Sequence, residues 1–310
     1  MSEPVLGGFH IIRPAPVIME GRGVGAKPLG LRLMSDLHIG AANTDYKLIT
    51  RERDDAIEHQ DRILINGDLF DLILPKDHKR YTPEAVHPRI QGTSMQVNAV
   101  VDWAVELLSP AAHLIDMLGV GNHETAVMKY HAVDPVMMVM YKLEEHARKT
   151  VPNHFINYGG YTGFVDYRLR CTTGGRSGGE CGSRLVIYYH HGSGGAAPVT
   201  KGLIDFNRRD TFIDSDIIWM GHKHNRLTVA VEKLSCPEIG DGLKIKEVRH
   251  IMTGAYFNTY VNQTQASIRE HGRRSNYAAD AGFAPQGKGG ARVLVRVVGK
   301  KKTMSMQVIQ

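Results

Sequence analysis

The chain has 310 residues, of which 42% are hydrophobic and 23% are charged, and its formal net charge at pH 7 is +6. These proportions are typical of a folded globular protein and exclude collagen-like, fibrous and disordered chains. No apolar run approaches the roughly 18 residues of a membrane-spanning helix, and the first residues do not form a secretory signal. We therefore expect a cytoplasmic protein without a membrane segment.

Short apolar runs alternate with helix-like stretches as far as His224, which predicts an α/β protein. Five runs are too short for helices and predict buried strands at 31–34, 62–66, 113–119, 185–189 and 217–220. Apolar residues at helical spacing predict helices at about 45–58, 94–108, 134–149 and 199–207. The rest of the chain is β-rich, with strands expected near 226–234, 245–253, 255–262, 291–298 and 303–309.

The same patterns suggest a simple domain organisation. We expect an N-terminal extension over residues 1–28 and a single domain over residues 29–310. Polar, glycine-rich or proline-rich stretches predict loop insertions near 72–92, 172–183 and 263–290. Long loops of this kind are either lids and substrate contacts or tolerated insertions, and the sequence leaves both interpretations open.

Cysteine and histidine usage bears on the chemistry. The three cysteines, Cys171, Cys181 and Cys236, form no CxxC pair, which argues against a disulfide scaffold and against a thiolate zinc site. We expect reduced thiols. Histidine is abundant, with 16 residues, and imidazole is both a common acid or base and a common ligand of transition metals.

Possible metal ligands follow the ends of the predicted strands. Asp36 and His38 come after the first strand and, being two residues apart, can point the same way in an extended or turn segment. Asp68 follows a glycine at the end of the second strand, where the chain can turn sharply at the carboxyl edge of the sheet. The later strands are followed by Asn122 and His123, by His190 and His191, and by His222 and His224.

Five successive strand ends that all carry oxygen or imidazole donors are unlike a chance arrangement, and they predict a site for two metal ions. His123 directly follows Asn122 and cannot point in the same direction. A histidine beside the ligands that is not itself a ligand is available for proton chemistry.

These residues fall in five motifs, DLH, GDLFD, GNHE, HHG and GHKH, spread from Asp36 to His224. In this order the motifs resemble those of the calcineurin-like metallophosphoesterases. The resemblance implies a four-layer α/β/β/α sandwich and a metal-dependent phosphoesterase. It does not specify a substrate, since the family includes protein phosphatases, phosphodiesterases, pyrophosphatases and repair nucleases.

The resemblance also implies a role for each ligand. The first metal would be held by Asp36, His38 and His224, the second by Asn122, His190 and His222, and Asp68 would bridge the two. We favour His190 over His191 in the fourth motif because the family's ligand most often comes first after the strand. His191 would then be a residue that packs against or orients a ligand.

The implied reaction is hydrolysis of a phosphoester by a hydroxide that bridges two divalent cations, without a covalent enzyme intermediate. His123 would protonate the leaving oxygen, and Asp71 would orient His123 and raise its pKa. The alternative for Asp71 is a loop or helix-start carboxylate. Mixed nitrogen and oxygen ligands suit Mn²⁺, which we favour, and iron or zinc as alternatives.

Two features bear on the substrate. The family's protein phosphatases carry an arginine where this chain has Leu72, whereas the GDLFD motif is closer to the nuclease subunit of the double-strand-break repair complex. Residues after Val261 have nine basic and two acidic side chains, and Lys76, Lys79 and Arg80 follow GDLFD. We therefore expect a phosphodiesterase with DNA or RNA as the favoured substrate class. Alternatives are a phosphomonoesterase or small-nucleotide hydrolase and, third, a non-catalytic binding scaffold.

Overall fold

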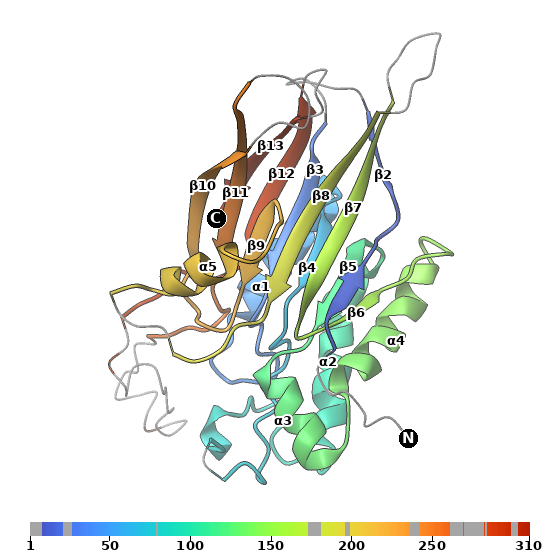
Figure 1. The fold of residues 1–310 in the computed structure, drawn as a ribbon. Coiled ribbons are helices and arrows are strands. Elements are labelled where there is room, and N and C mark those ends of the chain that lie inside the picture. The colour runs from blue at the N-terminus through green and yellow to red at the C-terminus, as the bar shows by residue number, and fades with distance from the viewer. Residues whose placement is uncertain are drawn as a thin grey trace, which may run out of the picture.

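The structure is a computed structural model that describes residues 8–20, 27–78, 80–172, 181–195, 199–235, 242–260, 269, 282, 284–298 and 303–310. Within these residues, two β-sheets stack face to face and helices cover their outer faces (Figure 1). The mixed α/β class predicted from the sequence is confirmed.

The first sheet has six strands, and its central strands β3, β4, β5 and β6 run parallel. Strand β12 pairs antiparallel with β3, and β13 pairs antiparallel with β12. In sheet order the strands are β13 (Thr303–Ile309), β12 (Ala291–Val298), β3 (Leu29–Met34), β4 (Arg62–Ile65), β5 (Ile115–Gly119) and β6 (Asn157–Gly160).

The second sheet has seven strands. Its parallel centre is formed by β8, β9 and β11, while β10 and β7 flank it in antiparallel pairs and β1 and β2 both pair parallel with β7. The strands are β1 (His10–Ile12), β2 (Val17–Glu20), β7 (Thr162–Thr172), β8 (Cys181–His190), β9 (Ile217–Met220), β11 (Lys244–Met252) and β10 (Leu227–Ser235).

Helices lie on both sides of the stacked sheets (Figure 1). Helices α1 (Tyr46–His59), α2 (Gln96–Leu108) and α4 (Pro135–Arg148) pack on the first sheet, and α5 (Leu203–Asp210) packs through Phe206 on the second. This arrangement is consistent with the expected α/β/β/α order. The chain also forms α3 (Asn122–His131) and two 3₁₀ segments, Pro83–Ala85 and Ser109–Leu114.

The burial patterns of β3 and β12 show how the strands form the core between the two sheets. All six residues of β3 are buried, as expected of a parallel strand covered on both faces. Strand β12 alternates instead: Ala291, Val293, Val295 and Val297 face the other sheet and are buried, while the residues between them are partly exposed. The two sheets therefore share one continuous core.

Side chains cap the N-terminal ends of α1 and α4. The Asp45 carboxylate accepts a hydrogen bond from the N–H of Leu48 (3.1 Å) at the start of α1. Asp134 does the same for α4, where Pro135 occupies the first helical position and needs no N–H partner. These caps explain why both helices begin within about a residue or two of the expected positions.

One expected strand needs correction, and two segments have contacts that the sequence did not predict. Within residues 8–20, β1 and β2 pair with β7 at one side of the second sheet. No strand forms over residues 255–260, where the chain makes a single bridge between Phe257 and Thr44. The insertion at 72–92 is partly built into the fold through a bridge between Val86 and Ala41. The other two insertions lie mostly outside the described residues.

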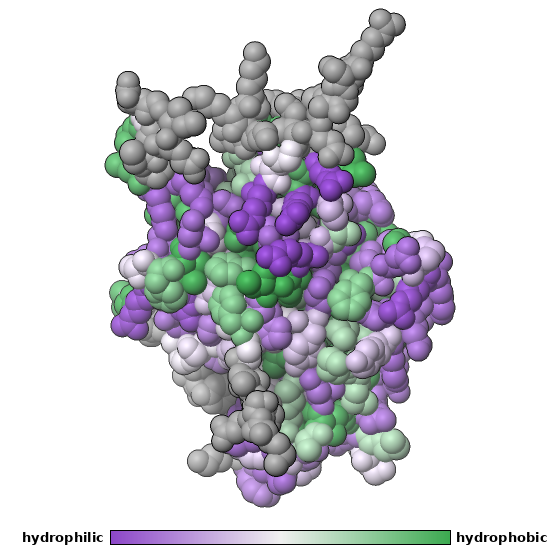
Figure 2. All heavy atoms as spheres, turned by 45° about the vertical axis from the view of Figure 1, so that its right-hand side comes forward, coloured by the Kyte–Doolittle hydropathy of each residue, from purple (hydrophilic) through white to green (hydrophobic). Residues whose placement is uncertain are grey.

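The edge of the sandwich formed by β1, β2 and β6 carries several exposed apolar side chains, among them Phe9, Ile11, Ile18 and Phe155. Figure 2 brings this side of the molecule forward and shows hydrophobic residues gathered in the middle of the face, next to strongly hydrophilic ones. In the part of the chain that the structure describes, no helix combines the length and the apolar character needed to cross a membrane.

Candidate metal centre

Most of the predicted ligands, joined by His191, converge at the carboxyl ends of strands from both sheets. Strands β3, β4 and β5 of the first sheet lead into Asp36, Asp68 and Asn122, and strands β8 and β9 of the second lead into His191 and His222. The side chains form three neighbouring groups, and within each group the possible ligand atoms lie within 4.8 Å of one another. The groups are Asp36, His38 and His224; His38, Asp68 and His123; and Asp68, His191 and His222.

The backbone at these positions is unusual. Among the described non-glycine residues, eight have positive φ, and five of the eight are candidate ligands. The five are Asp36 (55°), His38 (49°), Asp68 (46°), His222 (66°) and His224 (55°). Non-glycine residues rarely adopt this left-handed conformation, which is typical of functional sites where the surrounding structure enforces it.

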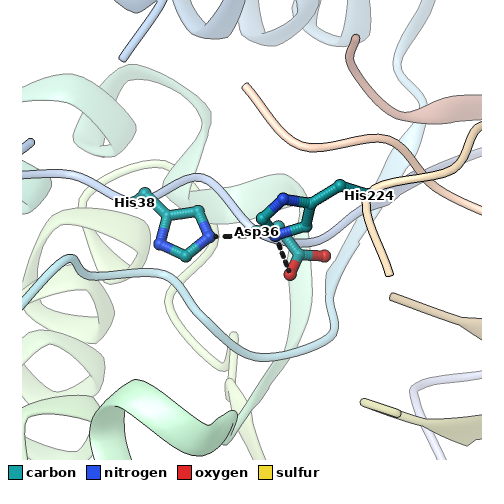
Figure 3. A group of neighbouring side chains, drawn as sticks. All are labelled: Asp36, His38 and His224. Carbon is teal, nitrogen blue, oxygen red and sulfur yellow. Dashed lines mark hydrogen bonds and ion pairs between the residues drawn. The ribbon is translucent and has the colours of Figure 1, made fainter. Parts of the chain in front are cut away.

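The first group consists of Asp36, His38 and His224 (Figure 3). Nε2 of His224 lies 3.3 Å from Oδ1 of Asp36 and 3.4 Å from Nε2 of His38. Asp36 is fully buried and His38 is 2% exposed. Three donor atoms thus face a common point, as ligands of one cation would.

Neighbouring groups fix the Asp36 carboxylate. The backbone N–H of His222 donates to both of its oxygens (3.1 and 3.0 Å), and the Ser35 hydroxyl donates to Oδ2. Ser35 is in turn 2.6 Å from the Thr253 hydroxyl. Burial alone would raise the pKa of Asp36, but hydrogen bonding to His224 and the charges of nearby histidines lower it.

The second group consists of Asp68, His191 and His222. Nδ1 of His191 lies 2.8 Å from the backbone carbonyl of Asn66, and Nε2 lies 3.2 Å from Oδ2 of Asp68. Because a carbonyl can only accept, Nδ1 carries the hydrogen and Nε2 is the ring nitrogen that can bind a metal. This arrangement is characteristic of metal-ligating histidines.

Asp68 lies between the groups and belongs to two of them. Its Oδ1 accepts the backbone N–H of His123 (2.9 Å), and its Oδ2 faces His191. Asn122 supplies a further oxygen: its Oδ1 is buried and has no hydrogen-bond partner. A buried, unpaired amide oxygen is costly unless something binds it, so the donor set fits divalent cations.

The geometry argues against His190 as a ligand, and we replace it with His191. Side chains alternate along β8, and Tyr189 and His191 share the face toward the first sheet, whereas His190 points to the other face. Nδ1 of His190 instead accepts the N–H of Gly192 (2.8 Å). Burial and the charge of Arg209 lower the pKa of His190 to about 4. Apolar side chains occupy both faces of β8, so the sequence did not reveal which face holds the site.

We expect His191→Ala to remove one of two bound metal ions and His190→Ala to leave both in place. Only the His191 ring approaches Asp68 and His222. Metal content per chain after equilibration with Mn²⁺ distinguishes the two variants. Loss of an ion in His190→Ala but not in His191→Ala would contradict the assignment.

His123 and Asp71 form a largely enclosed pair beside the ligands. Nδ1 of His123 lies 3.2 Å from Oδ1 of Asp71, and the side chains are 12% and 10% exposed. Burial alone would lower the pKa of His123, but the charges of Asp68 and Asp71 raise it to about 9. His123 therefore favours its protonated form near neutrality, as expected of a general acid.

Sequence reasoning missed Glu124. This fully buried residue accepts three backbone N–H groups, from Asp68 (3.0 Å), Phe70 (3.0 Å) and Gly121 (2.7 Å), so it joins the loop after β4 to the start of α3. Burial and the Asp68 charge raise its pKa to about 7. A glutamate at the third position of a helix is a capping signal, which could have drawn attention to it.

Phe257 was missed as well. Its ring stacks on the His38 ring with centroids 4.2 Å apart and planes 18° apart, and its centroid lies 5.7 Å from that of His224. Phe257 comes from the segment after β11 and reaches the site through its bridge to Thr44. No sequence motif marks this residue, because its role depends on a contact between segments more than 200 residues apart.

Several of the basic residues that favour a nucleic-acid substrate are engaged within the chain. The Lys76 ammonium donates to the carbonyl of Tyr130 (2.8 Å), and Arg80 pairs with Asp77 (2.6 Å). In the C-terminal segment, Lys288 pairs with Asp45, and Arg292 pairs with Asp61 (2.7 Å). Lys79 and the cations at 273–274 and 300–302 lie outside the described residues.

No protein-family model and no curated protein matches this sequence. Among solved structures, the chain is similar to a predicted phosphoesterase from Streptococcus pneumoniae (11% identity, 91% of this chain, 98% of that chain, TM-score 0.27). It is also similar to a metallophosphoesterase from Sphaerobacter thermophilus (14% identity, 91% of this chain, 89% of that chain, TM-score 0.29). A calcineurin-like phosphoesterase from Bacillus subtilis is similar as well (11% identity, 91% of this chain, 90% of that chain, TM-score 0.32). At these TM-scores the similarity carries no functional argument, and the proposed function rests on the site itself.

Proposed function

We propose that this chain is a metal-dependent phosphoesterase of the calcineurin-like type that hydrolyses phosphodiester bonds at two divalent cations. The observation that carries the proposal is the convergence of six donor side chains from both sheets, together with the buried, unpaired Oδ1 of Asn122 and the nearby His123, whose pKa is raised. A site that had lost its catalytic activity would be expected to lack some of these groups. Here both the proposed metal ligands and the proposed general acid, His123, are present. The scaffold alternative is therefore disfavoured.

The residues divide between the two cations. One would be held by Asp36, His38 and His224, and the other by Asn122, His191 and His222, with Asp68 reaching both. Two such ions supply an activated water and neutralise charge on the phosphate oxygens when they are bound. Mixed imidazole and oxygen ligation supports Mn²⁺ as the working metal, with iron or zinc as alternatives.

The chain's own contribution to the reaction is proton transfer and orientation. Nδ1 of His123 faces Asp71, so its other nitrogen, Nε2, is the one available to donate a proton to the leaving oxygen. Asp71 holds the ring in this orientation. Its own pKa is lowered, because hydrogen bonding and charge from His123 and His38 outweigh burial, so it stays ionised.

We expect Asp71→Asn to move the alkaline limb of the pH–rate profile to lower pH. Asp68 and Asp71 raise the pKa of His123 above its ordinary value of 6.5, which extends the pH range over which the ring is protonated. Removing one of these charges lowers that pKa, and the acid is then lost at a lower pH. Rates measured from pH 6 to pH 10 test this. An unmoved limb would show that Asp71 does not act on the proton of His123.

Leu72 supports a diester substrate. It is 5% exposed and packs in the core between the first sheet and its helices, so this position offers no cation to a doubly charged terminal phosphate. We propose DNA or RNA as the substrate class on the basis of the local charge after Val261. The intramolecular pairs of Lys288 and Arg292 reduce the cations available there.

A side-by-side assay with added Mn²⁺ tests the substrate. We expect faster hydrolysis of a generic phosphodiester than of a generic phosphomonoester, and cleavage of single- or double-stranded DNA whose binding weakens steeply with salt. Replacing Arg273, Arg274 and Lys300–Lys302 with glutamine should flatten the salt dependence without changing hydrolysis of the small diester. Efficient monoester hydrolysis without salt-dependent nucleic-acid binding would instead identify a small-substrate enzyme.

A further inference from the structure

One oxygen of Asp71 contacts two histidines with different tasks. Oδ1 lies 3.2 Å from Nδ1 of His123 and 3.4 Å from Nδ1 of His38. Both separations are longer than the roughly 2.7–2.9 Å of a charge-assisted hydrogen bond, so these are ion-pair contacts rather than formed hydrogen bonds. His38 is a proposed metal ligand and His123 is the proposed acid, so the same carboxylate touches both functions.

The two edges of the His38 ring face opposite partners. Nδ1 faces Asp71, and Nε2 faces His224 in the group with Asp36. Within the described residues Nδ1 makes no hydrogen bond of normal geometry, and the Asp71 carboxylate, 3.4 Å away, is its ion-pair partner. Phe257 therefore contacts one face of the ring, and Asp71 lies at the edge opposite His224.

We propose that Asp71, besides pairing with His123, is a positioning residue for His38: it holds the hydrogen on Nδ1 and thereby presents Nε2 to the first cation. This inference rests on the proposed function, because it needs a cation between Asp36, His38 and His224. For a metal-ligating histidine, a carboxylate on the second nitrogen fixes the ring orientation and makes the ligand more basic.

The local backbone supports this role. The N–H of Asp71 donates to the carbonyl of Ile39 (2.9 Å), and the N–H of His38 donates to the carbonyl of Asp68 (3.1 Å). These bonds join the segment after β3 to the segment after β4 on both sides of the contact. The carboxylate is therefore held at a fixed distance from the ring that it orients.

The second cation would have a different orienting group. His191 donates from Nδ1 to the Asn66 carbonyl, and Asp71 has no part in that contact. Removing the Asp71 carboxylate should therefore weaken one metal site and spare the other. A role limited to His123 would leave both sites unchanged.

The test is calorimetric titration of metal-stripped protein with Mn²⁺. Wild type should show two binding events. Asp71→Asn removes the charge and Asp71→Ala removes the acceptor, and each should weaken one event by about 10- to 100-fold while the other stays within about twofold. Combined with His191→Ala, which removes the second site, the remaining event should be the weakened one.

Two controls make the result specific. Asp77→Asn changes a carboxylate six residues away that pairs with Arg80, and it should leave both events unchanged. His123→Ala should also leave both unchanged, because Asp71 then serves His38 alone. Wild-type affinities in both Asp71 variants would overturn the inference and leave the proposed function standing. Fewer than two binding events in wild type would overturn the proposed function itself.

Discussion

His123→Ala should retain two metal ions per chain and lose on the order of 10²–10⁴-fold in turnover, the usual effect of removing a general acid. The His123 ring touches Asp71 rather than serving as a proposed ligand, and its backbone N–H, which the substitution keeps, is the group that binds Asp68. Metal content and turnover of a phosphodiester, measured on the same preparation, separate the two effects.

The matched control is His131→Ala, at the other end of α3, where the side chain is exposed. It should leave turnover unchanged. A small effect of His123→Ala, similar to that of the control, would show that another group protonates the leaving oxygen. Loss of metal in His123→Ala would place His123 among the ligands.

Asp68→Asn should reduce occupancy at both metal sites, and we expect a loss of affinity of more than about 100-fold, since even residues that only orient ligands contribute about 10- to 100-fold. The carboxylate lies in two of the ligand groups, and its pKa is well below the ordinary value because the charges of His191 and His123 outweigh burial. Asparagine keeps the shape of the side chain and removes the charge that both cations would share.

Mn²⁺ titration of Asp68→Asn measures this effect. Asp102→Asn, which alters an exposed carboxylate paired with Lys142 on the surface, should bind two ions as wild type does. If Asp68→Asn lost one site and kept the other at full affinity, Asp68 would be a ligand of one metal and not a bridge.

Much of this site is predictable because it depends on strand ends. Asp36, Asp68, Asn122 and His222 each stand two or three residues after the end of a strand, and parallel strands have their carboxyl ends at one edge of the sheet. A run of apolar residues stopped by a polar donor is therefore enough to place each ligand. Strands β9, β12 and β13 were also predicted at the residues where they occur.

The features that were missed depend on information beyond the local sequence. His190 and His191 are adjacent, and only the packing of the second sheet against the first decides which ring enters the site. The role of Glu124 depends on the backbone N–H groups that it binds in the loop after β4, and the role of Phe257 depends on its contact with His38. Strands β1 and β2 are short, and they form through their pairing with the distant strand β7.

The central claim is that two divalent cations bound by this site make the chain a phosphoesterase. The most direct test is to strip the protein of metal, restore Mn²⁺ in steps, and follow hydrolysis of a generic phosphodiester against ions bound per chain. We predict no hydrolysis without metal and full activity at two ions per chain. Full activity in metal-free protein or with a single bound ion, or no hydrolysis of any phosphoester with two ions bound, would contradict the account.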